Sequence, residues 1–402
     1  MNCLLRDFVQ SGEVEIKTGP FGTQLKAAEY VEHGTPVLNV KNLGYSTVVK
    51  NKLDRVGSAT LERLNVHILH RGDIVFGRKG AVDRHAYIGS DEEGWMQGSD
   101  CIRVRVKTQR INPRYLSYYF LTPEHRAFMI SMCSHGTTMA SLNQKILEKI
   151  EVPLPDRNVQ DRIVALLESL DEKIETNSRI NDNLLTQAKE ITKQWLIDND
   201  QDYELLPLSR VAKINPDTYS PKEEWEYVNY LDTSSITDGS ISEIQYIDPT
   251  TEKLPSRARR KIAANDVVFS TVRPNQRHFG IINAPKPNML VSTGFAVIRS
   301  KHPKICNELI YLCLTEDEFI EKMQQLAEQS TSTFPSIKPS NLGVCKIPCP
   351  KDNSSVDFTE TLRSLFTLIS SNQRESAFLA EMRDALLPKL MSGEVGVSNI
   401  DL

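Results

Sequence analysis

The sequence predicts an α+β protein in which two strand-rich domains follow one another and each is followed by a long helix. Two observations predict this fold: a ladder of residues at coiled-coil spacing occurs twice, and short strand-like runs precede each copy. We expect the two helices to pair with each other as an antiparallel coiled coil, which gives the chain pseudo-two-fold symmetry. The expected parts are a first domain, a helix, a second domain, and a helix with a tail, at residues 1–157, 158–199, 200–354 and 355–402.

The first ladder covers residues 163–195 in steps that alternate between four and three residues, the spacing of a coiled-coil seam. Shifted by 195 residues it recurs over 358–390, which places Asn177 level with Asn372. Either seam alone would leave an apolar stripe in water, so each helix is the expected partner of the other. Matched asparagines fix the register of a coiled coil, and they favour it over the alternative of two helices that each pack on their own domain. The predicted seam residues are Leu167, Leu170, Ile174, Asn177, Leu184, Leu362, Leu365, Ile369, Asn372 and Leu379.

Residues 1–150 contain short apolar runs interrupted by Gly, Pro and Asn, as at 72–77, and these runs predict strands. A helix is expected after Asn112-Pro113, because proline is favoured in the first turn of a helix. The hydroxyl-rich segment 136–143 predicts a turn. A last strand then ends in prolines, which exclude helix until the ladder begins.

The second half repeats this order of features. Asp-Ile-Val-Phe at 73–76 is followed by Arg-His at 84–85, and Asp-Val-Val-Phe at 266–269 is followed by Arg-His at 277–278 with the same spacing. The repeat therefore covers both the domains and the helices.

Charge is distributed unevenly along the chain. The net charge is −4, but residues 1–150 carry +5 and 151–200 carry −5, while 201–350 carry −1 and 351–402 carry −3. The first domain is therefore basic enough to bind a polyanion, and the second has local basic clusters. Solvated loops without a function are the alternative interpretation of these clusters.

Membrane and secreted classes are disfavoured. No apolar run approaches the roughly 20 residues of a membrane span, and the first residues lack the basic and then apolar layout of a signal peptide. Seven scattered cysteines indicate a reducing compartment, so we expect a cytoplasmic protein. Cys345 and Cys349 lie close together, but without a second pair or nearby histidines they are expected in a buried strand rather than in a zinc site.

Catalytic motifs are absent from the sequence: there is no glycine-rich phosphate loop, no H-E-x-x-H, no G-x-S-x-G and no Asn/Asp-Pro-Pro-aromatic run. We therefore expect no catalytic residue, no metal site and no cofactor in this chain. The loops do offer Arg, Asn and Gln, which can bind G or A edges, and Lys, Ser and Thr, which suit phosphates. The candidate DNA contacts are Lys26, Arg78, Lys79, Arg84, His85, Gln97, Thr137, Thr138, Asn143, Arg273, Asn275, Gln276, Arg277, His278 and Thr333.

Several segments together resemble the specificity (S) subunit of type I restriction-modification systems, over essentially the full chain. The segments are GPFGTQLK at 19–26, GTPVLNVKN at 34–42, RGDIV at 71–75, MASLN at 139–143, and VPLP at 152–155 followed by Gln160 and the ladder. The resemblance implies two target recognition domains, each reading one part of a bipartite DNA site, joined by two antiparallel helices that dock modification subunits. In the second half Ile214-Asn215-Pro216 stands where Gly19-Pro20-Phe21-Gly22 would be expected, so the contacts of that loop are not carried across.

The resemblance also implies that catalysis lies in partner subunits. Two modification subunits would methylate adenine with S-adenosylmethionine, and restriction subunits would use ATP and Mg for translocation and cleavage. This chain would bind double-stranded DNA and no membrane. A stand-alone DNA-binding regulator of the same fold is the alternative, and an enzyme with its own methyltransferase or nuclease site is a more distant one.

Residues that the two halves share cannot explain how the halves read different sequences. Arg84 and Arg277 are therefore expected either to contact phosphate or to hold the fold through ion pairs with Asp73 and Asp266. Unmatched loop residues are expected to specify bases. They are Arg78, Lys79, Asn275 and Gln276.

Overall fold

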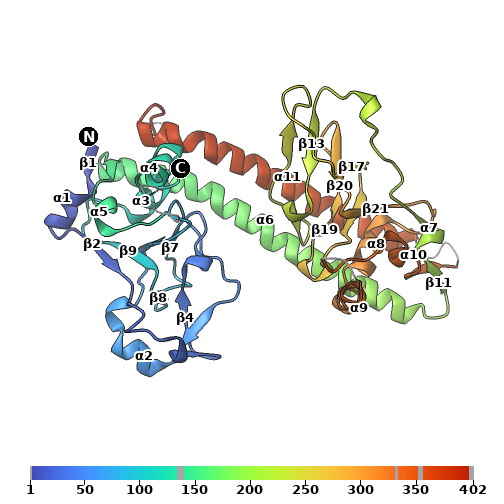
Figure 1. Ribbon diagram of the computed structural model, residues 1–402, viewed down its shortest axis with the longest axis horizontal. Helices are drawn as coiled ribbons and strands as arrows, with labels where there is room; N and C mark the ends of the chain where they lie inside the picture. Colours follow the sequence, from blue (N-terminus) through green and yellow to red (C-terminus); the bar gives the residue numbers. More distant parts are fainter. Residues whose placement is uncertain (1, 134–139, 331–333, 352–355, 398–402) are drawn as a thin grey trace. The chain divides into compact units, whose positions relative to one another are not determined.

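The computed structural model describes residues 2–133, 140–330, 334–351 and 356–397 (Figure 1). The chain forms two compact units, Met1–Glu175 with Ser376–Leu402, and Thr176–Glu375. Two long helices, α6 (Arg157–Asp198) and α11 (Val356–Ser392), each contribute one half to either unit.

The first unit contains two four-stranded sheets and one strand pair. In the first sheet all neighbours are antiparallel, whereas the second sheet has one parallel pair, β4 with β8. The first sheet is β2 (Val14–Thr18), β9 (Cys101–Val106), β6 (Ile74–Gly77) and β7 (His85–Tyr87). The second is β3 (Tyr30–Val31), β5 (Asp54–Val56), β4 (Thr35–Leu38) and β8 (Met96–Gln97), and the pair is β1 (Asn2–Leu4) with β10 (Glu151–Pro153).

Short helices connect these strands. They are α1 (Leu5–Gln10), α2 (Ser58–Arg63), α3 (Pro113–Tyr119), α4 (Pro123–Cys133), α5 (Gln144–Leu147) and the 3₁₀ turns η1 (Ala27–Glu29), η2 (Val40–Asn42) and η3 (Asn65–His67). The helix predicted after Asn112-Pro113 is α3, and its start has a clear physical cause. The Asn112 side chain accepts hydrogen bonds from the backbone N–H of Arg114 (2.9 Å) and Tyr115 (3.4 Å), while Pro113 occupies the first turn.

The second unit repeats the arrangement. Its all-antiparallel sheet is β12 (Ala212–Ile214), β21 (Phe295–Ser300), β18 (Asp266–Ser270) and β19 (Phe279–Ile282). The sheet with one parallel pair is β16 (Gln245–Ile247), β13 (Val228–Leu231), β20 (Met289–Ser292) and β17 (Ala258–Lys261), and the closing pair is β11 (Tyr203–Pro207) with β22 (Lys346–Pro350). The remaining elements are β14 (Ile236–Thr237), β15 (Ser240–Ile241), α7 (Leu208–Val211), α8 (Asn307–Leu314), α9 (Asp317–Glu328), α10 (Pro339–Gly343), η4 (Pro221–Glu223), η5 (Thr233–Ser235) and η6 (Pro274–Gln276). The prediction of two strand-rich domains in tandem is confirmed.

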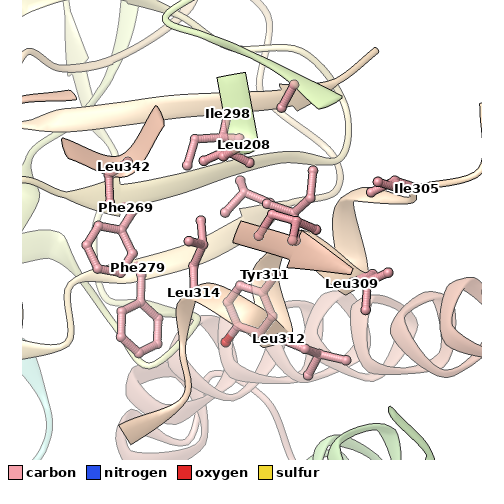
Figure 2. Packing of buried hydrophobic residues seen from close by; sticks show 14 of the residues in the cluster. Leu208, Phe269, Phe279, Ile298, Ile305, Leu309, Tyr311, Leu312, Leu314 and Leu342 are labelled. Carbon is pink, nitrogen blue, oxygen red and sulfur yellow. The ribbon is translucent and has the colours of Figure 1, made fainter. Parts of the chain in front are cut away.

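Each unit has a core in which the sheet, the short helices and both long helices meet. In the first unit Ile74 of the sheet, Leu116 of α3, Leu167 of α6 and Leu390 of α11 belong to one buried cluster. Figure 2 shows the corresponding cluster of the second unit, where the rings of Phe269 in β18 and Phe279 in β19 stack on each other and Tyr311 of α8 lies beside Phe279. Burial of these side chains holds the long helices to the domains.

Ladder residues of α6 and α11 pack in the same buried cluster within each unit. None of the twenty ladder positions is exposed. In the first unit the early residue Leu167 shares a core with the late residue Leu390, whereas in the second unit Leu184 packs with Leu362 from the start of α11. Each unit therefore pairs the two helices antiparallel. The alternative, in which each helix packs on its own domain, also holds in part, because residues at the ends of the ladders contribute to the domain cores.

The matched asparagines meet, as predicted. Within the second unit, Asn177 Nδ2 lies 3.5 Å from the backbone oxygen of Asn372 and donates to Glu375 Oε2 at 2.8 Å. Asn372 Nδ2 in turn donates to Asn181 Oδ1 at 2.9 Å. A buried polar layer of this kind tolerates only registers that satisfy its donors, so it fixes the pairing of α6 with α11.

Candidate nucleic-acid interface

A loop after β6 carries three of the predicted DNA contacts, Arg78, Lys79 and Arg84. The loop is held against the segment before α5: Gly80 N donates to Ala140 O (3.0 Å), and Leu142 N donates to Arg78 O (2.8 Å). This pairing leaves Lys79 exposed and Arg78 half-buried at the surface. We call the two paired segments, 78–84 and 140–143, the first loop cluster.

The second unit contains the equivalent arrangement after β18. Ile337 N donates to Thr271 O (2.8 Å), and Arg273 N donates to Pro335 O (2.9 Å). We call the paired segments 271–278 and 334–337 the second loop cluster. Its short helix η6 presents Asn275 and Gln276 to solvent, and the Arg273 guanidinium lies 5.0 Å from the exposed Phe334 ring. The predicted base-reading residues thus occupy equivalent loops in both units.

Three predicted threonines, Thr137, Thr138 and Thr333, lie outside the described residues. Asn143 and Lys26 are exposed, as a DNA contact requires. Asn143 also has a structural role, because its side chain accepts a hydrogen bond from Ile146 N (3.0 Å) and caps α5.

The predicted contacts His85 and Gln97 are corrected by the structure, since both side chains are fully buried. His85 Nε2 lies 2.9 Å from Ser117 Oγ, and burial lowers the pKa of the imidazole to about 3, so it is neutral. Gln97 Nε2 donates to the backbone oxygens of Lys17 (2.9 Å) and Cys101 (3.1 Å). Both residues hold the fold beneath the surface. His278 is half-buried and donates from Nδ1 to Ile236 O (2.6 Å).

The Asp residues that precede the repeated strands do not pair with Arg84 and Arg277, so that interpretation is wrong. Asp73 instead accepts two hydrogen bonds of 2.7 Å from Arg105. Asp266 accepts two bonds of the same length from Arg299. Both carboxylates are almost completely buried, and a planar guanidinium is the partner that satisfies both oxygens of a carboxylate.

The twin arginines have different surroundings. Arg84 is exposed, its guanidinium lies 5.4 Å from the exposed Tyr45 ring, and within the described ranges no carboxylate pairs with it. Its neighbour Asp83 pairs with Arg126 instead, at 3.0 Å. The charge of Arg84 is therefore available to a ligand.

Arg277 is engaged within its own unit. It pairs with Asp238 at 2.6 Å and with Asp317 at 2.7 Å. Although partial burial acts against the charged form, the bonds to Asp238 and then Asp317 leave the pKa of Arg277 raised. Equal spacing in the sequence therefore does not give the two arginines an equal role.

The segment around Gly19 explains why the two halves differ at this point. A Cβ at Gly19 would lie 1.9 Å from Gly98 O, so no side chain fits there. In the second unit β12 already ends at Ile214, and Asn215 adopts a left-handed conformation with φ of 54°. The two halves therefore have different backbone conformations at this point.

Sequence reasoning did not find Tyr45 and Arg126. Tyr45 is 42% exposed, and its ring centre lies 5.4 Å from the guanidinium of Arg84 and 4.4 Å from that of Arg126. No spacing in the sequence links residues 45, 84 and 126, because they meet only through the folding of three separate segments.

Two classes of site receive no support from the described residues. Across the described ranges, no three His, Cys, Asp or Glu side chains gather in a way that could hold a metal ion. No described helix combines the length and the apolar character that crossing a bilayer requires.

Residues 14–186 match the family described as "Type I restriction modification DNA specificity domain". The chain is 19% identical to the HindI type I restriction enzyme specificity subunit of Haemophilus influenzae, over 81% of this chain and 87% of that one. It is 25% identical to the MjaIX specificity subunit of Methanocaldococcus jannaschii, over 93% of this chain and 90% of that one. The crystal structure of the type I restriction-modification S subunit from M. genitalium has the same fold, with a TM-score of 0.56, 15% identity, and coverage of 97% and 96%.

Proposed function

We propose that this chain, which is similar to type I restriction-modification specificity subunits over most of its length, recognises a bipartite DNA site for a multisubunit enzyme. Each unit would read one half-site. The observation that carries the proposal is the pair of equivalent loop clusters, each fixed by backbone hydrogen bonds and each presenting cationic or amide side chains to solvent. Rigid loops with such side chains suit the edges of bases in a groove.

Within each cluster we propose a division between positioning and reading. Arg84 and Lys26 are exposed cations in the basic first domain and would contact phosphates. Arg277 and His278 are engaged internally and would support the second cluster. The proposed base-reading residues are Arg78, Lys79, Asn143, Arg273, Asn275 and Gln276, with Thr137, Thr138 and Thr333 as further candidates outside the described residues.

Catalysis would lie outside this chain. Two modification subunits with S-adenosylmethionine would methylate adenine, and restriction subunits with ATP and Mg would translocate and cleave DNA. The α6–α11 pair would dock the modification subunits, and the target recognition domains would be residues 1–157 and 200–354. We place the protein in the cytoplasm, where such an enzyme meets DNA.

A domain exchange tests the proposal. Residues 1–150 are replaced by the matching domain of a relative, and methylated adenines are mapped across the host genome. One half of the recognised site should change, because the first loop cluster is built within the exchanged segment. A map in which both halves change would reject independent reading by the two units.

Assembly provides the second measurement. The tagged full chain should capture a methyltransferase subunit from its own host, and the purified chain alone should bind no S-adenosylmethionine. A chain that binds its DNA site without any methyltransferase partner in the host would instead be a stand-alone regulator. Binding of the methyl donor by this chain would contradict its non-catalytic role.

A further inference from the structure

Arg114 of α3 is a partly buried cation that contacts both the first domain and α6. Its side chain is 16% exposed, and its guanidinium lies 4.7 Å from the Tyr87 ring and 4.6 Å from the Tyr118 ring. On the helix side, Nε is 3.2 Å from Glu168 Oε1 and Nη2 is 3.6 Å from Asp171 Oδ2. The cation is therefore held between two aromatic rings and two carboxylates of α6.

The same guanidinium also reaches toward the first loop cluster. Arg114 Nη1 donates to Ser46 Oγ at 2.9 Å, and Ser46 Oγ lies 2.7 Å from Ser117 Oγ. Ser117 Oγ is 2.9 Å from His85 Nε2, and Ser46 N donates to His85 O at 2.9 Å. Ser46, Ser117 and His85 are all buried, so these bonds are shielded from water.

Two surface residues continue this line of contacts. Ser46 directly follows Tyr45, and His85 directly follows Arg84, which lies over the Tyr45 ring. The surface formed by Tyr45 and Arg84 is thus anchored by the hydrogen bonds that end at Arg114. Ser46 also has φ of 60°, a strained conformation for serine that such surroundings can hold in place.

On the other side, the contacts reach both long helices. Tyr118 OH donates to Asp171 Oδ2 of α6 at 2.6 Å, and Asp171 Oδ1 accepts from Arg383 Nη1 of α11 at 2.9 Å. Arg114 therefore lies between the part of the domain that carries the proposed phosphate contact and the helix pair on which this domain is mounted.

The second unit has different residues at the matching positions. Asn307 stands where Arg114 would be, and Phe366 stands where Asp171 would be. Asn307 accepts from Ser300 N (2.7 Å) and donates to Asn265 O (2.7 Å), while Phe366 packs edge-on against Tyr311. Asn307 thus bonds within its own domain, and the ring contact of Tyr311 with Phe366 joins α8 to α11, so the line of contacts through Arg114 is a feature of the first domain.

We propose that Arg114 is a positioning residue, which fixes the direction in which the first loop cluster faces relative to α6 and α11. Resting on the proposed function, this makes Arg114 a determinant of how many base pairs may separate the two half-sites. A guanidinium suits the role because its planar fork of donors can bond in several directions at once, whereas a lysine ammonium is a single point of charge. Without the Arg114 guanidinium, the first loop cluster could rotate relative to α6 and α11, while its base-contacting side chains stay the same.

The test uses the full chain assembled with its own modification subunits, and a plasmid library in which the half-sites are separated by the native spacing and by one or two base pairs more or less. Arg114→Met keeps the side-chain volume, and Asp171 keeps its bonds to Tyr118 and Arg383. We expect this variant to methylate the neighbouring spacings, so that preference for the native spacing falls by about tenfold or more. The bases recognised in both half-sites should stay the same. Arg114→Lys should restore the preference in part.

Tyr118→Phe, which removes the bond to Asp171, should give a smaller change in the same direction. Tyr311→Phe at the matching position is the control, because the Tyr311 ring packs edge-on against Phe366 of α11, and spacing preference should be unchanged. Equal loss of methylation at every spacing in Arg114→Met would show a merely structural role and overturn the inference. An unaltered preference for the native spacing would also overturn the inference. If Arg114→Met does not assemble, Arg114→Lys and Tyr118→Phe decide by the same criterion. A wild-type complex that recognises no bipartite site would instead refute the proposed function.

Discussion

The two units attach the same fold to the same pair of helices by different chemistry. In the first unit Asp171 of α6 bonds to Tyr118 of the domain and to Arg383 of α11. In the second unit Phe366 of α11 packs on Tyr311, and Phe358 and Trp195 stack with ring centroids 4.6 Å apart and planes 7° apart. The first attachment is therefore ionic and the second is aromatic.

The difference teaches that a repeat preserves the ladder more strictly than the residues beside it. The ladder must stay apolar at most layers, because both helices share one seam. Asp171 and Phe366 lie beside the ladder and contact the domain of their own unit, so a charge can stand at one of these matched positions and a ring at the other. The physical consequence is that the two attachments respond to different conditions, since ionic contacts depend on salt and apolar contacts depend on buried area.

The largest expected effect comes from removing the aromatic attachment. Phe366 is 5% exposed, and Phe366→Ala leaves a cavity beside Tyr311. We expect a loss of about 3–4 kcal/mol in the free energy of unfolding, the usual cost of deleting a buried phenyl ring. Chemical denaturation followed by circular dichroism measures this loss.

Leu368 provides the matched control for that measurement. It lies two residues away on the same helix and is 52% exposed, so Leu368→Ala should change stability by less than about 0.5 kcal/mol. Comparable losses in both variants would mean that burial against the domain does not stabilise this attachment.

The next largest expected effect is a loss of stability at acidic pH, which comes from two buried histidines of the first unit. Burial lowers the pKa of His125 to about 3, and burial together with the charges of His125 and Arg114 lowers the pKa of His85 to about 3. Both groups are neutral when folded but become protonated near pH 6.5 when unfolded, so stability is full above pH 6.5 and falls as the pH falls toward 3. Between pH 7 and pH 5 each histidine should cost about 2 kcal/mol.

His125→Phe isolates one of these terms. The His125 ring packs 4.7 Å from Phe120 and is almost completely buried, so phenylalanine fits the same apolar surroundings without a proton to bind. The variant should lose about 2 kcal/mol less than the wild type between pH 7 and pH 5. Denaturation curves at the two pH values give the difference. Identical pH dependence in the two proteins would show that His125 is not buried as a neutral group.

Added salt should also distinguish the ionic attachment from the aromatic one, but with a smaller effect on stability. Asp171→Asn keeps the shape of the side chain but removes its charge, and Asp171 and Arg383 are each 27% exposed. We expect a loss of about 1 kcal/mol at low salt, which shrinks as added salt screens the wild-type pair. The cost of Phe366→Ala should not shrink in the same titration. Parallel behaviour of the two variants would contradict the ionic and aromatic assignment.

The sequence was sufficient for what depends on periodicity. The heptad ladder predicted both helices, their pairing and the contact between Asn177 and Asn372, because one rule of spacing governs every layer. The repeated motifs likewise predicted two domains with the same order of strands. Such features depend on neighbours along the chain, which a single sequence displays directly.

Contacts between distant segments could not be predicted in this way. Asp73 pairs with Arg105 rather than Arg84, and His85 is buried although it follows an exposed arginine. A pattern of residue types shows which side chains can form ion pairs, but the register between β6 and β9 decides which of them meet. A search for a second repeated pair would have found Arg105 and Arg299, each 32 or 33 residues after its aspartate.

The twin arginines give the smallest expected effect on stability and the sharpest comparison between the units. Arg84 is exposed and has no carboxylate partner within the described ranges, whereas Arg277 is paired with Asp238 and Asp317. If Arg84 contacts a phosphate, Arg84→Ala should weaken binding to all sequences alike and flatten the slope of log affinity against log salt by about one unit. Arg277→Ala should leave that slope unchanged and lower the melting temperature slightly, because exposed ion pairs contribute roughly 0–1 kcal/mol each.

Equilibrium binding to a DNA duplex at several salt concentrations, with melting curves of the same samples, measures both quantities. Gln276→Ala serves as the contrast, because a lost base contact should reduce discrimination at particular base pairs by about 1–3 kcal/mol and leave the salt slope unaltered. Equal changes of slope in the Arg84 and Arg277 variants would show that the two loop clusters meet the DNA backbone in the same way. The observed ion pairs of Arg277 would then have to open on binding, and the asymmetry between the units would belong to the free protein alone.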